Sequence, residues 1–162
     1  MFQNLIHIEL WCFGFFHGWD GGMELLRNCP KLQILFIRKV CILVWFFACY
    51  FFHIYFIWCK MNGYVLSLWQ WNASLSKDWD CPILGLECVE SHLRSCTILN
   101  FEGSENDLRF ATYIMQNARL LQEMTIEVTT SSSNEMQKHQ IIEELSICPK
   151  MSQGCKLTFW IY

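Results

Sequence analysis

Two short segments decide the fold that this sequence predicts: NLIHIEL at residues 4–10 and KLQILFI at residues 31–37. They repeat with a period of about 27 residues. At that spacing their apolar positions coincide: Leu5 over Leu32, Ile8 over Leu35 and Leu10 over Ile37. Alternating apolar and polar residues predict half-buried strands. Between the two segments, Asp20 can cap a short helix from Met23 to Asn28, which the Cys29-Pro30 pair ends. The predicted unit is strand, loop, helix, strand.

The second half of the chain predicts further strands at a similar spacing. Thr97 to Phe101 and Met124 to Val128 are both apolar and rich in β-forming residues. Leu99 and Ile126, one in each strand, are again separated by the period of the first two segments. Lys156 to Phe159 forms a last predicted strand, about 31 residues beyond its predecessor by the same repeat spacing.

Two amphipathic helices are predicted between these strands. Ser104, followed three residues later by Asp107, resembles a capping box at the start of the first helix. The apolar face of that helix is formed by Leu108, Ala111, Met115, Ala118 and Leu121. After the polar loop 129–134, a second helix has an apolar stripe and ends before Pro149. The stripe is Ile141, Ile142 and Leu145.

A period of roughly 20 to 29 residues with one strand and one helix is the pattern of leucine-rich repeats. Each such unit buries its apolar face only against its neighbours, so the units stack into an arc of parallel strands. We therefore expect an α/β fold of the strand-helix solenoid type. The alternative is a compact α/β domain.

Composition narrows the classes of protein to which the chain can belong. It has 162 residues, 53% hydrophobic and 17% charged, which excludes a disordered chain. The net charge of −3 provides no broad positive field and argues against nucleic acid as a partner. The ten cysteines are expected to be reduced, because a chain of this length does not need disulfides and no signal peptide opens it.

Residues 40–70 differ from the rest of the chain. From Val40 to Trp58, every residue except His53 is apolar. The full segment Val40 to Gln70 holds 11 of the 26 aromatic residues and none of the 15 acidic ones. As a helix, Val40 to Trp58 would be about 29 Å long, close to the roughly 30 Å of a bilayer core. It is therefore a candidate single-pass membrane helix.

Three interpretations of this apolar, helical insert stay open. A membrane helix is one, and a buried insert in a soluble protein is another. The third is a retained intron, since most of its residues can have codons with T at the first or second position. The six that cannot are Ala48, His53, Lys60, Asn62, Gly63 and Gln70. Under the intron hypothesis, 31 T-rich codons are translated in frame without a stop.

Several short motifs, in order, resemble the FBD domain of plants. Leu86 to Arg94, Phe101 to Gly103 and Tyr113 to Arg119 are the first three, and Leu121 to Ile126 and Cys155 to Phe159 continue the match. Upstream, ELLRNCPKLQ at residues 24–33 is similar to the last leucine-rich repeat before FBD in plant F-box/FBD/LRR-repeat proteins. The expected organisation is leucine-rich repeats at 1–39, the apolar insert at 40–70 and FBD at 71–162.

The resemblance implies a protein-recognition module without catalytic activity. In the family, this end selects substrates for an SCF-type ubiquitin ligase, while an F-box docks on the ligase adaptor. The F-box pattern is absent here, so we expect no adaptor contact and an unknown protein partner. With the insert removed, the expected location is cytoplasm or nucleus. The alternative function is an FBD protein tethered to a membrane through Val40 to Trp58.

One pattern could suggest a metal site. Cys88, His92 and Cys96 are spaced by four and would lie near one face of a continuous helix, as zinc ligands can. No fourth ligand follows at a usual spacing, and buried cysteines commonly act as small hydrophobic residues.

Acidic residues at a predicted helix start are a second candidate: Glu102, Glu105 and Asp107. The helix dipole stabilises acidic side chains there, so they need no cation. We therefore expect no catalytic, cofactor-binding or metal-binding residues, no cofactor, and no enzymatic activity in this chain.

Overall fold

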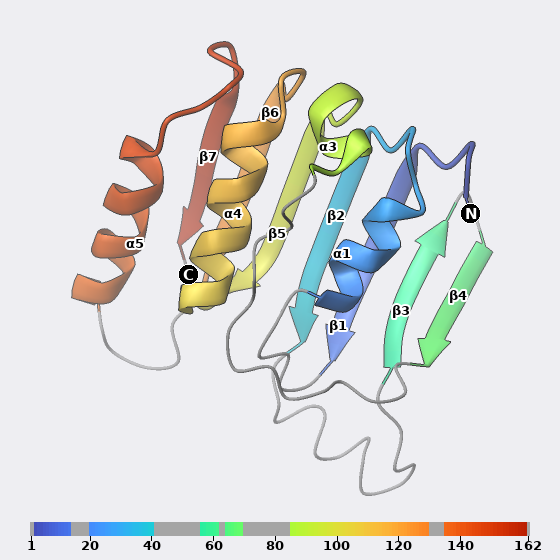
Figure 1. Ribbon diagram of the computed structural model, residues 1–162. Helices are drawn as coiled ribbons and strands as arrows, with labels where there is room; N and C mark the ends of the chain where they lie inside the picture. Colours follow the sequence, from blue (N-terminus) through green and yellow to red (C-terminus); the bar gives the residue numbers. More distant parts are fainter. Residues whose placement is uncertain are drawn as a thin grey trace, which may run out of the picture.

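The computed structural model describes residues 2–13, 20–40, 56–61, 64–69, 85–129 and 135–161. Its strands and helices alternate along most of the chain (Figure 1). In chain order they are β1 (His7–Phe13), α1 (Asp20–Arg27), β2 (Ile34–Val40), β3 (Phe56–Met61), β4 (Tyr64–Trp69), α3 (Glu87–Ser91), β5 (Ser95–Phe101), α4 (Glu105–Asn117), β6 (Glu123–Val128), α5 (Glu135–Ile147) and β7 (Lys156–Ile161).

All described strands belong to one sheet with the order β4-β3-β1-β2-β5-β6-β7. Strands β1, β2, β5, β6 and β7 are parallel to their neighbours in that series, while β3 pairs antiparallel with β1 and with β4. Parallel neighbours need a crossover between them, and α1, α3, α4 and α5 lie in these crossovers. The predicted α/β fold with a parallel sheet is thus confirmed.

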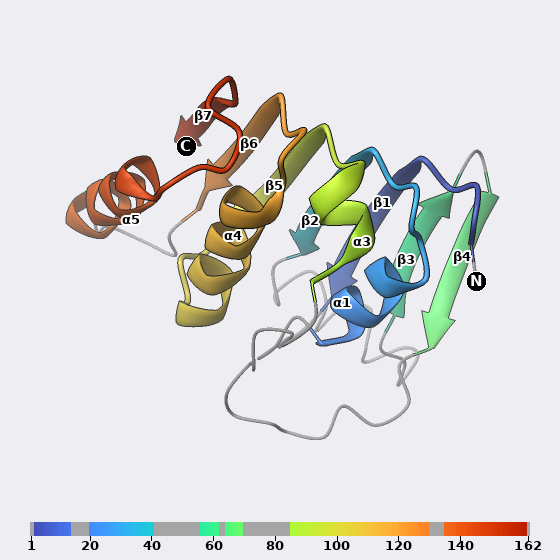
Figure 2. The same cartoon turned by 45° about the horizontal axis from the view of Figure 1, so that its top comes forward.

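The helices lie together on one face of the sheet (Figures 1 and 2). Buried side chains between the two layers form three rows across four neighbouring units. The rows are Leu5, Leu32, Leu93 and Leu121; Ile8, Leu35, Cys96 and Met124; and Leu10, Ile37, Ile98 and Ile126. Leu26, Phe110, Ile114 and Leu145 pack onto them from the helices. Full burial of each such side chain contributes about 1.5–3 kcal/mol.

Three local predictions are wrong in detail. The predicted helix face that ran through Leu121 is too long, because α4 ends at Asn117 and Ala118 is its C-cap. The helix α1 begins at Asp20 itself, so Asp20 is part of the helix and not its cap. In the pairing of β5 with β6, the residue opposite Ile126 is Ile98 and not the predicted Leu99, so the register differs by one position. Both Ile98 and Leu99 are apolar and buried, so alternation did not distinguish them.

The predicted helix Val40 to Trp58 is wrong where the structure describes it. Val40 ends β2, and Phe56 to Trp58 begin β3. Residues 41–55 lie outside the described residues. Within the described parts of the chain, no helix is long and apolar enough to cross a membrane.

Candidate protein-binding face

The face of the sheet opposite the helices is the candidate functional surface. The described residues place no helix on that face (Figure 2). Strand alternation sends every second side chain there, and the register lines them up across the five parallel strands. The first row is His7, Ile34, Ser95, Glu123 and Lys156, and the second is Glu9, Phe36, Thr97, Thr125 and Thr158. We call these two rows, together with Arg38 and Trp160, which stand two residues beyond the second row on β2 and β7, the open face.

The open face mixes charged, hydroxyl and apolar groups. Ser95 Oγ on β5 donates a hydrogen bond of 2.8 Å to Glu123 Oε1 on the neighbouring strand β6. Ile34 keeps 41% of its surface exposed. Beyond the second row, the Arg38 guanidinium lies 5.9 Å from the centre of the Phe36 ring, and Trp160 is 46% exposed. Aromatic and Arg side chains among polar neighbours are typical of protein-protein interfaces.

A buried ion pair lies at the carboxyl ends of β2 and β5. Lys39 Nζ donates to Asp107 Oδ1 at 3.0 Å and Oδ2 at 2.8 Å, and lies 3.7 Å from Glu102 Oε2. Asn100 Nδ2 donates to the Lys39 carbonyl oxygen. Only 3% of the Asp107 side chain is exposed, against 62% for Glu102. The contacts join the end of β2 to the start of α4.

Two residues with positive φ angles allow the chain to bring Asp107 and Asn100 to Lys39. Asn100 has φ of 59° and Gly103 has φ of 71°, a region that Asn and Gly enter most easily. Asn100 lies where the register of β5 against β6 shifts, and Gly103 turns the chain between β5 and α4. At the start of α4, Ser104 Oγ accepts a hydrogen bond of 3.2 Å from the Asp107 N–H. The capping role predicted for Ser104 is confirmed.

The three acidic residues predicted at this helix start therefore lie near two different basic side chains. Asp107 and Glu102 lie near Lys39, whereas Glu105 forms an ion pair with Arg109 one turn along α4. Sequence reasoning missed Lys39, because it stands 68 residues before Asp107 and no local motif links them.

The Cys88, His92 and Cys96 set does not share a helix. Cys88 lies in α3, which ends at Ser91, and His92 follows as its C-cap, whereas Cys96 lies in β5. The Cys88 thiol donates to the Leu26 carbonyl oxygen at 3.4 Å. No group of three or more metal-ligating side chains forms among the residues that the structure describes.

The buried thiols are poor nucleophiles. Burial, with a smaller contribution from the nearby Cys29 thiol, raises the pKa of Cys88 to about 12. Burial, with a smaller contribution from Cys155, raises the pKa of Cys96 to about 12 as well. The pKa of Cys29 rises to about 11, again chiefly through burial. Because the thiolate is the reactive form, these side chains stay inert near neutral pH.

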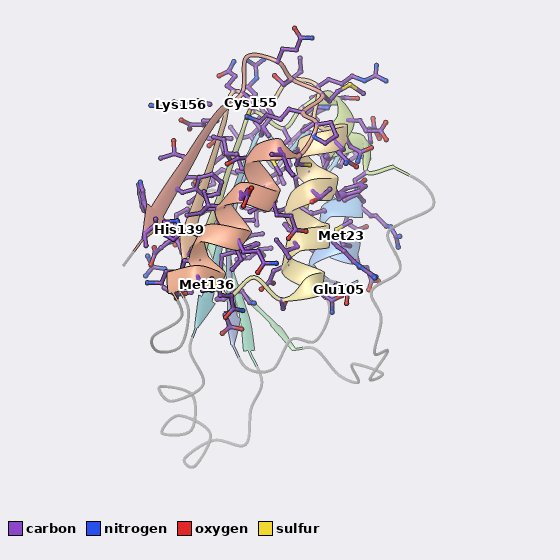
Figure 3. The ribbon with its side chains drawn as sticks, turned by 90° about the vertical axis from the view of Figure 1, so that its left-hand side faces the viewer. Met23, Glu105, Met136, His139, Cys155 and Lys156 are labelled. Carbon is purple, nitrogen blue, oxygen red and sulfur yellow. The ribbon has the colours of Figure 1, made fainter. Side chains whose placement is uncertain are left out.

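The far edge of the helix layer offers a contrasting exposed surface. Figure 3 shows Met136 and His139 on α5, which packs beside α4. Met136 is 79% exposed and Ile147, at the other end of α5, is 77% exposed. These two exposed side chains lie at opposite ends of a single helix, whereas the open face extends over five strands.

Comparison with known proteins identifies a matching family and several similar proteins. Residues 83–126 match the FBD family. Over 98% of its length, the chain is 26% identical to the F-box/FBD/LRR-repeat protein At5g56420 and 27% identical to the F-box/FBD/LRR-repeat protein At4g00160, both of Arabidopsis thaliana. Over 59% of its length, it is 30% identical to the FBD-associated F-box protein At3g52670 of the same plant.

The matches cover between a quarter and a third of the length of these relatives: 31%, 30% and 26% respectively. No solved structure matches it. The resemblance seen in the sequence is confirmed: residues 83–126 carry the FBD pattern, and nearly the whole chain is similar to plant F-box/FBD/LRR-repeat proteins.

Proposed function

We propose that the open face binds a protein and that the chain is the recognition part of an F-box/FBD/LRR-type protein. The observation that carries this proposal is the pair of outward rows that run in register across five parallel strands. Such a surface is broad and rigid, because β1, β2, β5 and β6 each pair with a strand on both sides and β7 pairs with β6. A surface of this breadth suits a folded protein or an extended peptide better than a small molecule.

The chemistry of the described residues supports recognition over catalysis. The buried thiols have raised pKa values, and the Lys39–Asp107 pair holds two structural elements together. The names of the relatives link this chain to F-box proteins, and F-box proteins of SCF-type ligases choose what is ubiquitinated. We therefore propose substrate selection for ubiquitination as the role, with no catalytic step in this chain.

The test compares substitutions on and off the open face. Ile34→Asp with Trp160→Asp places two charges on exposed apolar positions of the sheet, while Met136→Asp with Ile147→Asp does the same on α5. Purified wild-type and variant chains are crosslinked in Arabidopsis thaliana extract, and captured proteins are quantified by mass spectrometry.

We expect a set of proteins that the wild type and the α5 variant retain and that the open-face variant loses. Purified members of that set should then bind the wild type at least tenfold more tightly than the open-face variant. Equal capture by the two variants would show that the open face is not the binding surface.

Val40 lies in β2 and Phe56 to Trp58 lie in β3, while residues 41–55 lie outside the described residues. The membrane-tethered alternative requires the whole segment Val40 to Trp58 to be helical. It predicts that the protein stays in the membrane fraction after alkaline carbonate extraction. Release into the soluble fraction would remove it.

A further inference from the structure

A repeated hydrogen-bond pattern marks where each parallel strand begins. The backbone N–H groups of Gln33 and Ile34 both donate to the Ile6 carbonyl oxygen. The same arrangement recurs at the next two strands and in part at the last. Arg94 and Ser95 donate to Gln33, Gln122 and Glu123 donate to Arg94, and Lys156 donates to Gln122. Ile6, Gln33, Arg94 and Gln122 are therefore equivalent positions of successive units.

The spacing of these units is regular except at one step. By strand register, His7 lies opposite Ile34 and Ser95 opposite Glu123, and both steps equal a repeat of about 27 to 28 residues. Glu123 lies opposite Lys156, a step of about 33 residues. The step from Ile34 to Ser95, however, is about 61 residues, roughly twice as long. Without the segment 40–70 it would be about 30 residues, which falls inside the range of the other steps.

The contacts at both ends of the long step show that the flanking units meet directly. Before it, Lys39 is held by Asp107 and by the Asn100 side chain. After it, the Cys88 thiol reaches the Leu26 carbonyl oxygen, and the Leu86 N–H donates to the Tyr113 hydroxyl at 2.9 Å. These contacts do not involve residues 40–70 and complete the unit without them.

The segment that exceeds the repeat supplies the two antiparallel strands. β3 pairs with β1 from Ile8 opposite Met61 to Cys12 opposite Ile57, and β4 pairs with β3. Among the described residues, only β3 and β4 lie beyond β1, so without them β1 would be the edge of the five-stranded parallel sheet. An open strand edge presents unpaired N–H and C=O groups to other chains, and proteins commonly cover such edges.

We propose that residues 40–70 are an insertion into one strand-helix unit and that the β3–β4 pair is an edge cap for β1. Apart from Val40, the last residue of β2, the described part of this insertion lies outside the parallel array, where β3 and β4 cover the free side of β1. Its role is to prevent β1 from pairing with other chains.

The geometry of β1 identifies the amides that report on the cap. Ile34 N–H donates to the Ile6 carbonyl oxygen, so the even-numbered residues of this strand bond toward β2. The N–H groups of Glu9 and Trp11, which lie opposite Lys60 and Trp58, therefore point toward β3. Hydrogen exchange can follow the two sets separately.

The test uses the full chain and a variant that lacks residues 40–70, with Lys39 joined to Trp71. We expect the deletion variant to unfold cooperatively and to keep slow exchange at Ile8 and Leu10. Exchange at Glu9 and Trp11 should become at least a hundredfold faster in a dilute monomeric sample. The variant should also associate at concentrations where the full chain is monomeric, as measured by analytical ultracentrifugation.

A matched control separates edge pairing from general exposure. In the deletion variant, Glu9→Pro removes one outward N–H, and proline is tolerated on an edge strand. This change should suppress association. A deletion variant that does not fold would show that residues 40–70 are an integral part of the unit. Unchanged exchange at the two outward amides, or the absence of association, would overturn the capping role.

Discussion

The buried pair of Lys39 and Asp107 should be strongly coupled, because it has little contact with water. The exposed fractions of the two side chains are 17% and 3%, and two hydrogen bonds of 2.8 and 3.0 Å join them. Removing one partner of such a pair leaves an uncompensated charge and costs about 3–5 kcal/mol. Asp107 lies in the first turn of α4, where the helix dipole stabilises its unpaired carboxylate by about 0.3–1 kcal/mol. Lys39→Met should therefore destabilise the protein by about 3 kcal/mol.

Asp107→Asn should cost less than Lys39→Met. Without the carboxylate, Lys39 can turn toward Glu102, whose Oε2 already lies 3.7 Å from Nζ and which is well exposed. The expected cost is about 2 kcal/mol, typical of a lost hydrogen bond to a charged group. The double variant leaves no unpaired charge, so its cost should be about 3 kcal/mol and the coupling energy about 2 kcal/mol.

Urea denaturation followed by far-ultraviolet circular dichroism measures these four free energies of unfolding. Glu105 and Arg109 provide the matched control, because they form an ion pair on the same helix with 77% and 45% of their side chains exposed. Their coupling should be about 0.3–0.5 kcal/mol. A coupling for Lys39 and Asp107 as small as that of the control would refute the reasoning that burial makes this pair strong.

Three further predictions concern other parts of the chain. Gly103→Ala should destabilise by more than about 1 kcal/mol in thermal unfolding, because φ is 71° and a Cβ would lie 2.2 Å from Ile141 Cδ1; a neutral effect would contradict this geometry. Burial raises the pKa of Cys96 from 9.0 to about 12, so its contribution to stability is present below pH 9 and is lost as pH rises toward 12. Urea titrations should show that the free energy of unfolding falls between pH 8 and 10.5. Cys96→Ala should reduce the slope of this loss by up to about 1.4 kcal/mol per pH unit, and equal slopes for wild type and variant would exclude a contribution from Cys96. The edge cap proposed for β1 requires abundant polysomal message that retains all 31 codons, whereas cDNA reads that join Lys39 directly to Trp71 would support the intron hypothesis and remove the cap.

Local patterns in the sequence predicted the parallel strands and the start of α4, because alternation and capping involve residues close together in the chain. They could not predict the Lys39–Asp107 pair, which forms only when β2 and α4 meet in the fold. They also missed β3 and β4. A continuous apolar run does not distinguish a helix from a strand by periodicity. The signal was present, however: Asn62-Gly63 stands between the two apolar segments, and Asn-Gly is a strong hairpin signal.

The open face escaped prediction for a different reason. The inward positions of every unit must be apolar and must fit the same space, so they repeat, as Ile8, Leu35 and Met124 do. Among the described residues, no helix packs over the outward positions, so neighbouring strands can place an acid, an aromatic ring and a hydroxyl side by side, as in Glu9, Phe36 and Thr97. A repeat pattern therefore specifies the scaffold and leaves the outward residues unspecified. Because the scaffold fixes their positions but not their identity, those residues are free to vary with the protein that we propose the open face binds.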